Sequence, residues 1–179
     1  MRTEVRGWYC ETAAQCAGRQ TSVELIIPMR QLTYTMHFRG QASPSAENGK
    51  ILRMTSSGTS SNMETVVGPT GVETTLHPAP GDLAFLESEI RLTAQHAFEG
   101  KGVLTFGEEG EHELRLATVH AGHLGPSAVP GVMTGSVSWH IQGGTGRYQS
   151  ATGLISSTLT LTDSGELSEY HCGLIFVAE

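Results

Sequence analysis

The chain has few basic residues and no long apolar run. Its 179 residues include 11 Lys and Arg against 18 Asp and Glu, a formal net charge of −7 at pH 7. Binding to nucleic acid or to an anionic membrane needs a basic patch, so this balance argues against both partners. No apolar stretch approaches the roughly 20 residues of a membrane span. The opening MRTEVRGWYC also lacks the apolar core of a signal peptide, and we therefore expect a cytoplasmic protein.

Cysteine is scarce as well, and no catalytic or metal-binding motif stands out. The three cysteines have no metal-type spacing and form a poor disulfide framework. His120 and His123 are the only histidines close together in the sequence, and two ligands do not make a zinc site. The chain has no G-x-S-x-G elbow, and no Lys-Ser or Lys-Thr follows the glycines at 143–146. These absences argue against a hydrolase, a metalloenzyme and a phosphate loop, and we expect no cofactor.

Glycine, in contrast, is abundant. The chain has 22 glycines, well above the usual share of about 7%, and short runs of Thr, Ser and Val are separated by Gly or Pro. Such a composition favours many strands joined by tight turns. The length fits one domain.

The most specific stretch runs from Val132 to Gly153 and reads VMTGSVSWHIQGGTGRYQSATG. From Met133 to Ile141 apolar or small residues alternate with polar ones, which predicts a strand. The glycines at 143–146 can adopt positive φ and allow a sharp reversal. A second strand over 151–162 is expected to return beside the first, so the pattern predicts a hairpin.

The other segments predict more strands. Residues 31–39 alternate cleanly, and residues 83–98 keep a period of two that predicts one long strand. The Gly- and Pro-rich stretch 121–131 is expected to be a loop. About eight or nine strands without an interior helix predict an all-β fold, a single antiparallel barrel of about eight strands over residues 21–179. Polar and aromatic groups share the expected inner faces, which favours a ligand pocket over a filled interior.

The first twenty residues differ from the rest. Apolar and small residues recur at helical spacing on one face: Val5, Trp8, Tyr9, Thr12, Ala13 and Cys16. This predicts a short N-terminal helix over residues 1–20. Two roles fit it: a terminal helix packed against the outside of the sheet, or a lid that closes over a binding cavity.

A family resemblance rests on the string GGTGRY, the following ATG, the strand VSWHI before them and the closing GLIFVAE. Together they resemble the C-terminal half of barrels of the allene oxide cyclase type, a group that includes dirigent-like proteins. The chain length and the aromatic N-terminal helix most resemble the spiro-tetramate and spiro-tetronate cyclases of polyketide biosynthesis. This resemblance implies an intramolecular [4+2] cycloaddition of a linear polyene tetramate or tetronate, with no cofactor.

A cycloaddition of this kind needs apolar walls and one or two hydrogen-bond donors. Candidate substrate-binding residues are the large aromatic and methionine side chains Trp8, Tyr9, Tyr34, Met36, Phe38, Met54, Trp139 and Tyr170. Plain core packing is the alternative for those within the barrel. The catalytic candidates are His140 and Glu64, either of which could orient a polar head group, or could instead be an outward structural residue.

Two alternatives to the cyclase remain open. One is a non-catalytic, lipocalin-like barrel that binds an apolar small molecule. The other is an isomerising or oxide-opening cyclase, which would need a carboxylate such as Glu64 inside the lumen. We expect a polyketide-derived small molecule as the partner, and a homodimer because apolar residues on both faces of several strands predict a covered outer wall.

Overall fold

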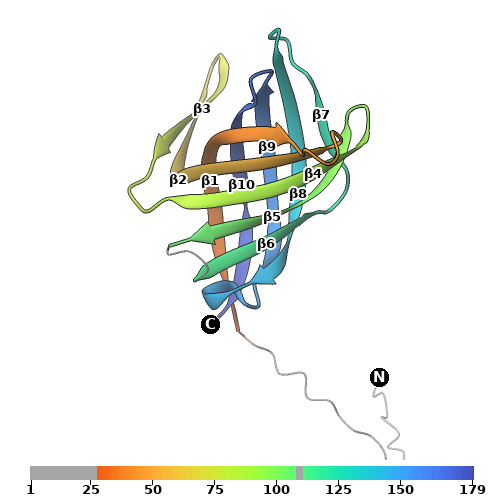
Figure 1. Cartoon of the computed structure of the whole chain (residues 1–179). Helices are drawn as coiled ribbons and strands as arrows, with labels where there is room; N and C mark the ends of the chain where they lie inside the picture. Colours follow the sequence, from red (N-terminus) through yellow and green to blue (C-terminus); the bar gives the residue numbers. More distant parts are fainter. Residues whose placement is uncertain (1–27, 108–110) are drawn as a thin grey trace, which may run out of the picture.

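The computed structural model describes residues 28–107 and 111–179, which form one antiparallel sheet of ten strands (Figure 1). The strands are β1 (Met29–Pro44), β2 (Ile51–Gly68), β3 (Gly71–Pro78), β4 (Ala84–Ala94), β5 (Ala97–Phe106), β6 (His112–Thr118), β7 (Gly122–Pro126), β8 (Val132–Gly144), β9 (Thr152–Thr162) and β10 (Glu166–Ala178). A single 3-10 turn, η1 (Gly146–Tyr148), lies between β8 and β9. The predicted helix over residues 1–20 lies outside the described residues.

Eight strands close into a ring. Their order is β1, β10, β9, β8, β6, β5, β4 and β2, and β2 pairs back with β1. In Figure 1, β2, β4, β5 and β6 cross in front of β1, β8, β9 and β10, so the two groups of strands face each other across the interior. This confirms the prediction of an all-β antiparallel fold with about eight strands, in the form of a barrel-like ring.

The interior of the ring is packed because each strand buries alternate residues. On β8, for example, Val137, Trp139 and Ile141 point inward and the residues between them point outward. The fully covered positions include Phe38, Phe98, Leu104, Leu114 and Ile155, each 0% exposed. Burial of such side chains is the main stabilising contribution to the fold.

The ring closes through a short seam. β1 pairs with β2 only from Met36 to Pro44, and glycines permit the close approach there. A Cβ at Gly58 would lie 2.2 Å from the carbonyl oxygen of His37, so no larger residue fits without a shift of the backbone. Before Met36, β1 pairs with β10 alone, and after Ser60, β2 pairs with β3 instead. The two strands therefore separate beside the first half of β1.

The β8–β9 hairpin is confirmed. The two strands pair from Val132 with Thr162 to His140 with Leu154. Gly143 and Gly146 have φ of 77° and 52°, the region that the turn requires and that glycine enters without strain.

Two other predictions of local structure were wrong. Residues 83–98 contain the whole of β4, a tight turn at Gln95 and His96, and the start of β5, because a turn here needs neither Gly nor Pro. The expected loop over 121–131 contains β7, which pairs with β5 and β8. Its Gly122 lies against the Phe98 ring, where a Cβ would come within 2.5 Å. Within the described residues, no helix has the length and apolar character needed to cross a membrane.

Candidate functional site

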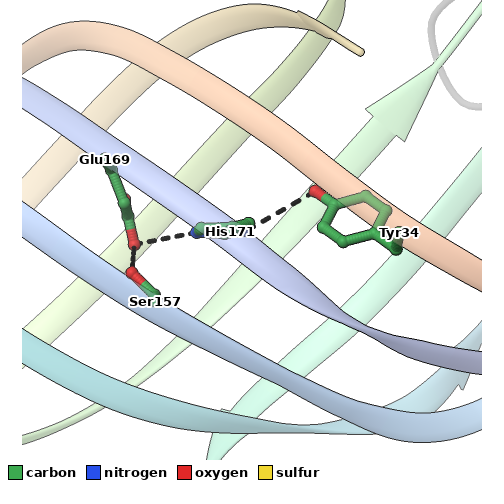
Figure 2. A network of polar contacts seen from close by, with 4 residues as sticks. All are labelled: Tyr34, Ser157, Glu169 and His171. Atoms are coloured by element: carbon green, nitrogen blue, oxygen red, sulfur yellow. Dashed lines mark hydrogen bonds and ion pairs between the residues drawn. The ribbon is translucent and has the colours of Figure 1, made fainter. Parts of the chain in front are cut away.

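Four polar side chains form a connected network inside the ring (Figure 2). The hydroxyl of Tyr34 on β1 lies 3.4 Å from Nδ1 of His171 on β10, and the His171 Nε2 lies 2.8 Å from Oε1 of Glu169. The Ser157 hydroxyl on β9 donates a hydrogen bond to the same carboxylate oxygen. The His171 and Glu169 side chains are 0% and 1% exposed. The register explains the grouping, because Ser157 pairs with His171 across β9 and β10.

The direction of the hydrogen bonds depends on the protonation of His171. When the imidazole is neutral, Nε2–H donates to Glu169 and Nδ1 accepts the Tyr34 hydroxyl proton. When it is protonated, both ring nitrogens donate, and the Tyr34 hydroxyl is free to donate elsewhere. The same network can therefore either draw a proton from Tyr34 or turn Tyr34 into a donor toward a ligand.

Tyr34 remains a neutral phenol in this setting. Burial is the main cause that raises its pKa well above the ordinary value of 10.0, and the charge of Glu169 and the presence of Tyr148 raise it further. A phenol that stays protonated can give one hydrogen bond without adding charge to an apolar cavity.

A cavity of about 610 Å³ lies where β1 separates from β2, and Tyr34 is part of its wall. We call it the β1–η1 cavity. Its lining comes mainly from the first half of β1, from β2 at the end of the seam and beyond, from the end of β5 and from η1, with one residue after β3 and one on β10. The residues are Leu32, Thr33, Tyr34, Thr35, Met36, Ser60, Ser61, Asn62, Met63, Ala79, Phe106, Arg147, Tyr148 and Ile175. The volume is in the range of small-molecule pockets, roughly 300–1,000 Å³. Tyr34 thus connects the cavity to the buried network.

The GGTGRY turn forms one side of this cavity. Tyr148 packs its ring against Phe106, with 5.3 Å between centroids, and Arg147 lies with Cζ 6.0 Å from the Tyr148 ring centre. Burial raises the pKa of Tyr148, and the nearby Arg147 opposes that shift. The most specific string of the sequence therefore contributes one aromatic and one cationic side chain to the site.

The predicted substrate-binding residues fall into four groups. Tyr34 and Met36 line the β1–η1 cavity. Phe38, Met54 and Trp139 are buried in the ring. Trp8 and Tyr9 lie outside the described residues. Tyr170 is 41% exposed and stacks on His37 outside the ring, with 4.1 Å between ring centres, so its expected place on the inner wall was wrong. Side chains alternate along a strand, and because the neighbouring Glu169 and His171 point inward, Tyr170 points outward.

The two predicted catalytic residues lie away from the interior. Glu64 belongs to the part of β2 that has left the ring, its side chain is 70% exposed, and its Oε2 lies 3.5 Å from Nε2 of His77. His140 is an exposed, outward residue of β8. The carboxylate that does lie inside the ring is Glu169.

Sequence reasoning missed Glu169, His171 and Ser157. The sequence did carry a signal. Leu167, Ile175 and Val177 lie at odd-numbered positions of the same strand, as Glu169 and His171 do, and all five are buried. Apolar residues occur at both parities of this strand, and Tyr170 was proposed for the inner wall, although the opposite parity faces the interior. Among the histidines, His123 lies beside His96, with ring centres 5.8 Å apart, and no group of described residues has the arrangement of a metal site.

Comparison with known proteins adds little. No family model matches the chain, and no curated protein matches it. A solved structure of a pterocarpan synthase dirigent protein aligns over 96% of this chain and 100% of its own, with 11% sequence identity and a TM-score of 0.32. A likeness of that strength carries no argument about fold or function, so the description of the ring rests on its own strand pairing.

Proposed function

We propose that the chain binds a mainly apolar small molecule in the β1–η1 cavity and promotes its cyclisation by an intramolecular [4+2] cycloaddition. A linear polyene with a tetramate or tetronate head is the proposed substrate. The observation that carries the proposal is Tyr34, which borders the cavity and is held from behind by the His171–Glu169 pair.

The cavity would act mainly by folding the polyene. Two carbon–carbon bonds form in the reaction and no proton, leaving group or electron is exchanged, so the substrate needs only to be held with diene and dienophile in contact. Preorganisation of this kind can lower a barrier by up to roughly 7–11 kcal/mol. Met36, Phe106 and Ile175 provide apolar surface for it.

Tyr34 would add electrostatic help. With His171 protonated and paired with Glu169, the imidazolium donates to the phenol oxygen, and the phenol proton is directed to a carbonyl conjugated with the dienophile. A donor fixed before the reaction stabilises charge that develops on that oxygen in the transition state. The resulting pair of opposite charges is buried and hydrogen-bonded, as such pairs must be.

The test compares Tyr34→Phe with Tyr170→Phe in the full chain. Both changes remove one phenol hydroxyl, but Tyr170 lies on the outer face. With a linear polyene tetramate followed by chromatography and mass spectrometry, we expect Tyr34→Phe to lower kcat about tenfold, equal to about 1.4 kcal/mol in the barrier, and Tyr170→Phe to leave it unchanged. Equal rates for the two variants would remove Tyr34 from the mechanism. If the polyene quenches the Trp139 fluorescence of the wild-type chain but the chain gives no cyclisation rate above background, the protein is a binding barrel only.

A cyclisation that moves a proton is the second candidate, and the buried Glu169 favours it. With His171 neutral, the network could accept the Tyr34 proton while Tyr34 takes one from the substrate, as in other hydroxyl–imidazole–carboxylate arrangements. Running the reaction in D₂O separates the two candidates. Deuterium in the product carbon skeleton indicates proton transfer, and its absence supports the cycloaddition.

A further inference from the structure

The β1–η1 cavity has an unusual charge pattern for this protein. The chain has a net charge of −7, yet the described residues that line the cavity include no Asp or Glu, and Arg147 is the one charged side chain among them. Every other lining residue is apolar or neutral and polar. A cavity with one cation and apolar walls suits a ligand of the opposite pattern, one anionic group on an apolar body.

The fold holds Arg147 at this position through its backbone. The positive φ of Gly146 tightens the turn, and a Cβ at Gly146 would come within 2.3 Å of the carbonyl oxygen of Glu111. The Arg147 N–H then donates to Nδ1 of His112 at 3.4 Å. Tyr148 anchors the turn by packing on Phe106. The guanidinium is therefore tethered beside the cavity while its side chain stays exposed.

Within the part of the chain that the structure describes, nothing occupies the guanidinium donors of Arg147. Among the described residues, no carboxylate lies within ion-pair distance of its guanidinium. The Tyr148 ring lies beside the guanidinium but does not accept hydrogen bonds from its N–H groups. A guanidinium fork matches the two oxygens of a carboxylate or of a deprotonated 1,3-dicarbonyl, and such charge-assisted bonds are about twice as strong as neutral ones.

We infer that the β1–η1 cavity selects ligands with one delocalised oxyanion head, a carboxylate or an enolate, bound by Arg147, with an apolar tail that extends along Met36 and Phe106 toward Tyr34. This specifies the substrate class of the proposed function and rests on it. The GGTGRY turn is thereby a specificity element, and its Arg147 distinguishes an acid from a neutral polyene of the same length.

Binding of a fluorescent probe tests the inference without any catalytic step. The probes are a linear conjugated tetraene fatty acid and its methyl ester, titrated at pH 8 against the full chain, with the rise in probe fluorescence as the readout. We expect the wild type to bind the acid about tenfold more tightly than the ester, a preference that falls as salt is added. Arg147→Gln should bring the acid to the affinity of the ester, and Arg147→Lys should keep part of the preference. Arg91→Gln, the same change at an exposed outer residue of β4, should change nothing.

Three outcomes would overturn it. They are equal binding of acid and ester to the wild type, an equal loss of both ligands in Arg147→Gln, and failure of both probes to bind. The cyclisation assay separates this inference from the proposed function. If the chain prefers the acid through Arg147 but does not cyclise the polyene, the anion site stands and the catalytic proposal fails. If the chain cyclises the polyene but shows no preference for the acid, only the anion site fails.

Discussion

The two halves of the ring differ in where their charged residues lie. The half made of β1, β8, β9 and β10 has buried polar groups inside, and its outward residues on β8 and β9 are largely uncharged, with hydroxyls predominating: Thr134, Ser136, Ser138, Ser156, Thr158 and Thr160. The half made of β2, β4, β5 and β6 has no buried charged residue among its described positions, and its outward residues are rich in charge: Arg53, Glu87, Glu89, Lys101 and Arg115.

This difference separates a supporting half from the half that holds the candidate site. The β2–β4–β5–β6 half has the usual arrangement of a stable sheet. Its core-facing residues are mainly apolar, with Ser56 and Ser88 as neutral exceptions, and its surface is charged, with Arg53 and Glu89 3.5 Å apart. The other half accepts the cost of burying Glu169 and His171, which well-packed apolar residues would avoid. Such a cost is expected where a group is kept for chemistry.

The largest expected effect removes packing from the supporting half. Phe98→Ala deletes a ring that is 0% exposed and packs against Gly122, and we expect a loss of about 3–5 kcal/mol in the free energy of unfolding. Phe85→Ala, on the exposed face of β4, should cost far less. Denaturant unfolding measures both. Below the melting temperature Phe98→Ala should still bind the probe acid, and a selective loss of binding would contradict the division into two halves.

In the half that holds the candidate site, Glu169→Leu should lower the free energy of unfolding by about 3 kcal/mol, because it leaves the buried His171 and Ser157 without their shared acceptor. The double variant Glu169→Leu with His171→Phe should recover much of that stability while cyclisation remains impaired. Chemical unfolding and the cyclisation assay are run on the same samples. If the double variant is less stable than the single one, the network is a stabilising element and the comparison fails.

A smaller effect is expected on the outer face of β9 and β10. Leu154, Tyr170 and Leu174 are 48%, 41% and 41% exposed there. We propose that a second copy of the chain covers this face, and we expect Leu174→Lys to weaken the dimer at least about tenfold in sedimentation experiments. Val103→Lys, an outward change on the charged half, is the matched control. A wild-type chain that sediments as a monomer at micromolar concentration would end this proposal.

The smallest expected effect concerns His37. Burial, and secondarily Arg39, lower its pKa from 6.5, while its Nε2 lies 2.9 Å from the Ser168 hydroxyl. The unfolded chain therefore takes up this proton at a higher pH than the folded chain. The contribution of His37 to stability is fully present above pH 6.5 and is lost as the pH falls from there through the lower pKa of the folded state. Between pH 7 and 5 the melting temperature of His37→Gln should fall slightly less steeply with pH than that of the wild type. Identical slopes for the two chains would contradict this.

Strand alternation was a good guide where one face of a strand is uniformly apolar. It predicted β8 through Trp139 and its neighbours, and the inward face of β1 through Tyr34, Met36 and Phe38. It failed where a turn has no glycine or proline, as at Gln95 and His96, and the two strands there were joined into one. Local sequence specifies pairing only when the turn chemistry is explicit.

The site was predictable in part. Tyr34 and Met36 were identified because large side chains at inward positions are found either in a core or around a ligand. Glu169 and His171 were not, because a buried carboxylate–histidine pair contradicts the rule that ionisable residues face water, and only long-range pairing with β1 and β9 makes their burial acceptable. The cavity was invisible for another reason, since it arises where β1 and β2 separate.

The pairing of the first and last strands has a consequence for biosynthesis. Tyr34 and His171 are 137 residues apart in the sequence. The first half of β1 has β10 as its partner strand among the described residues, so it stays an open edge until the C-terminal strand has left the ribosome. Ring closure and completion of the Tyr34–His171–Glu169 network are thus one event. A chain that ends before β10 lacks His171 and Glu169 as well as a neighbour for β1, so premature termination removes the candidate site and the closed ring together.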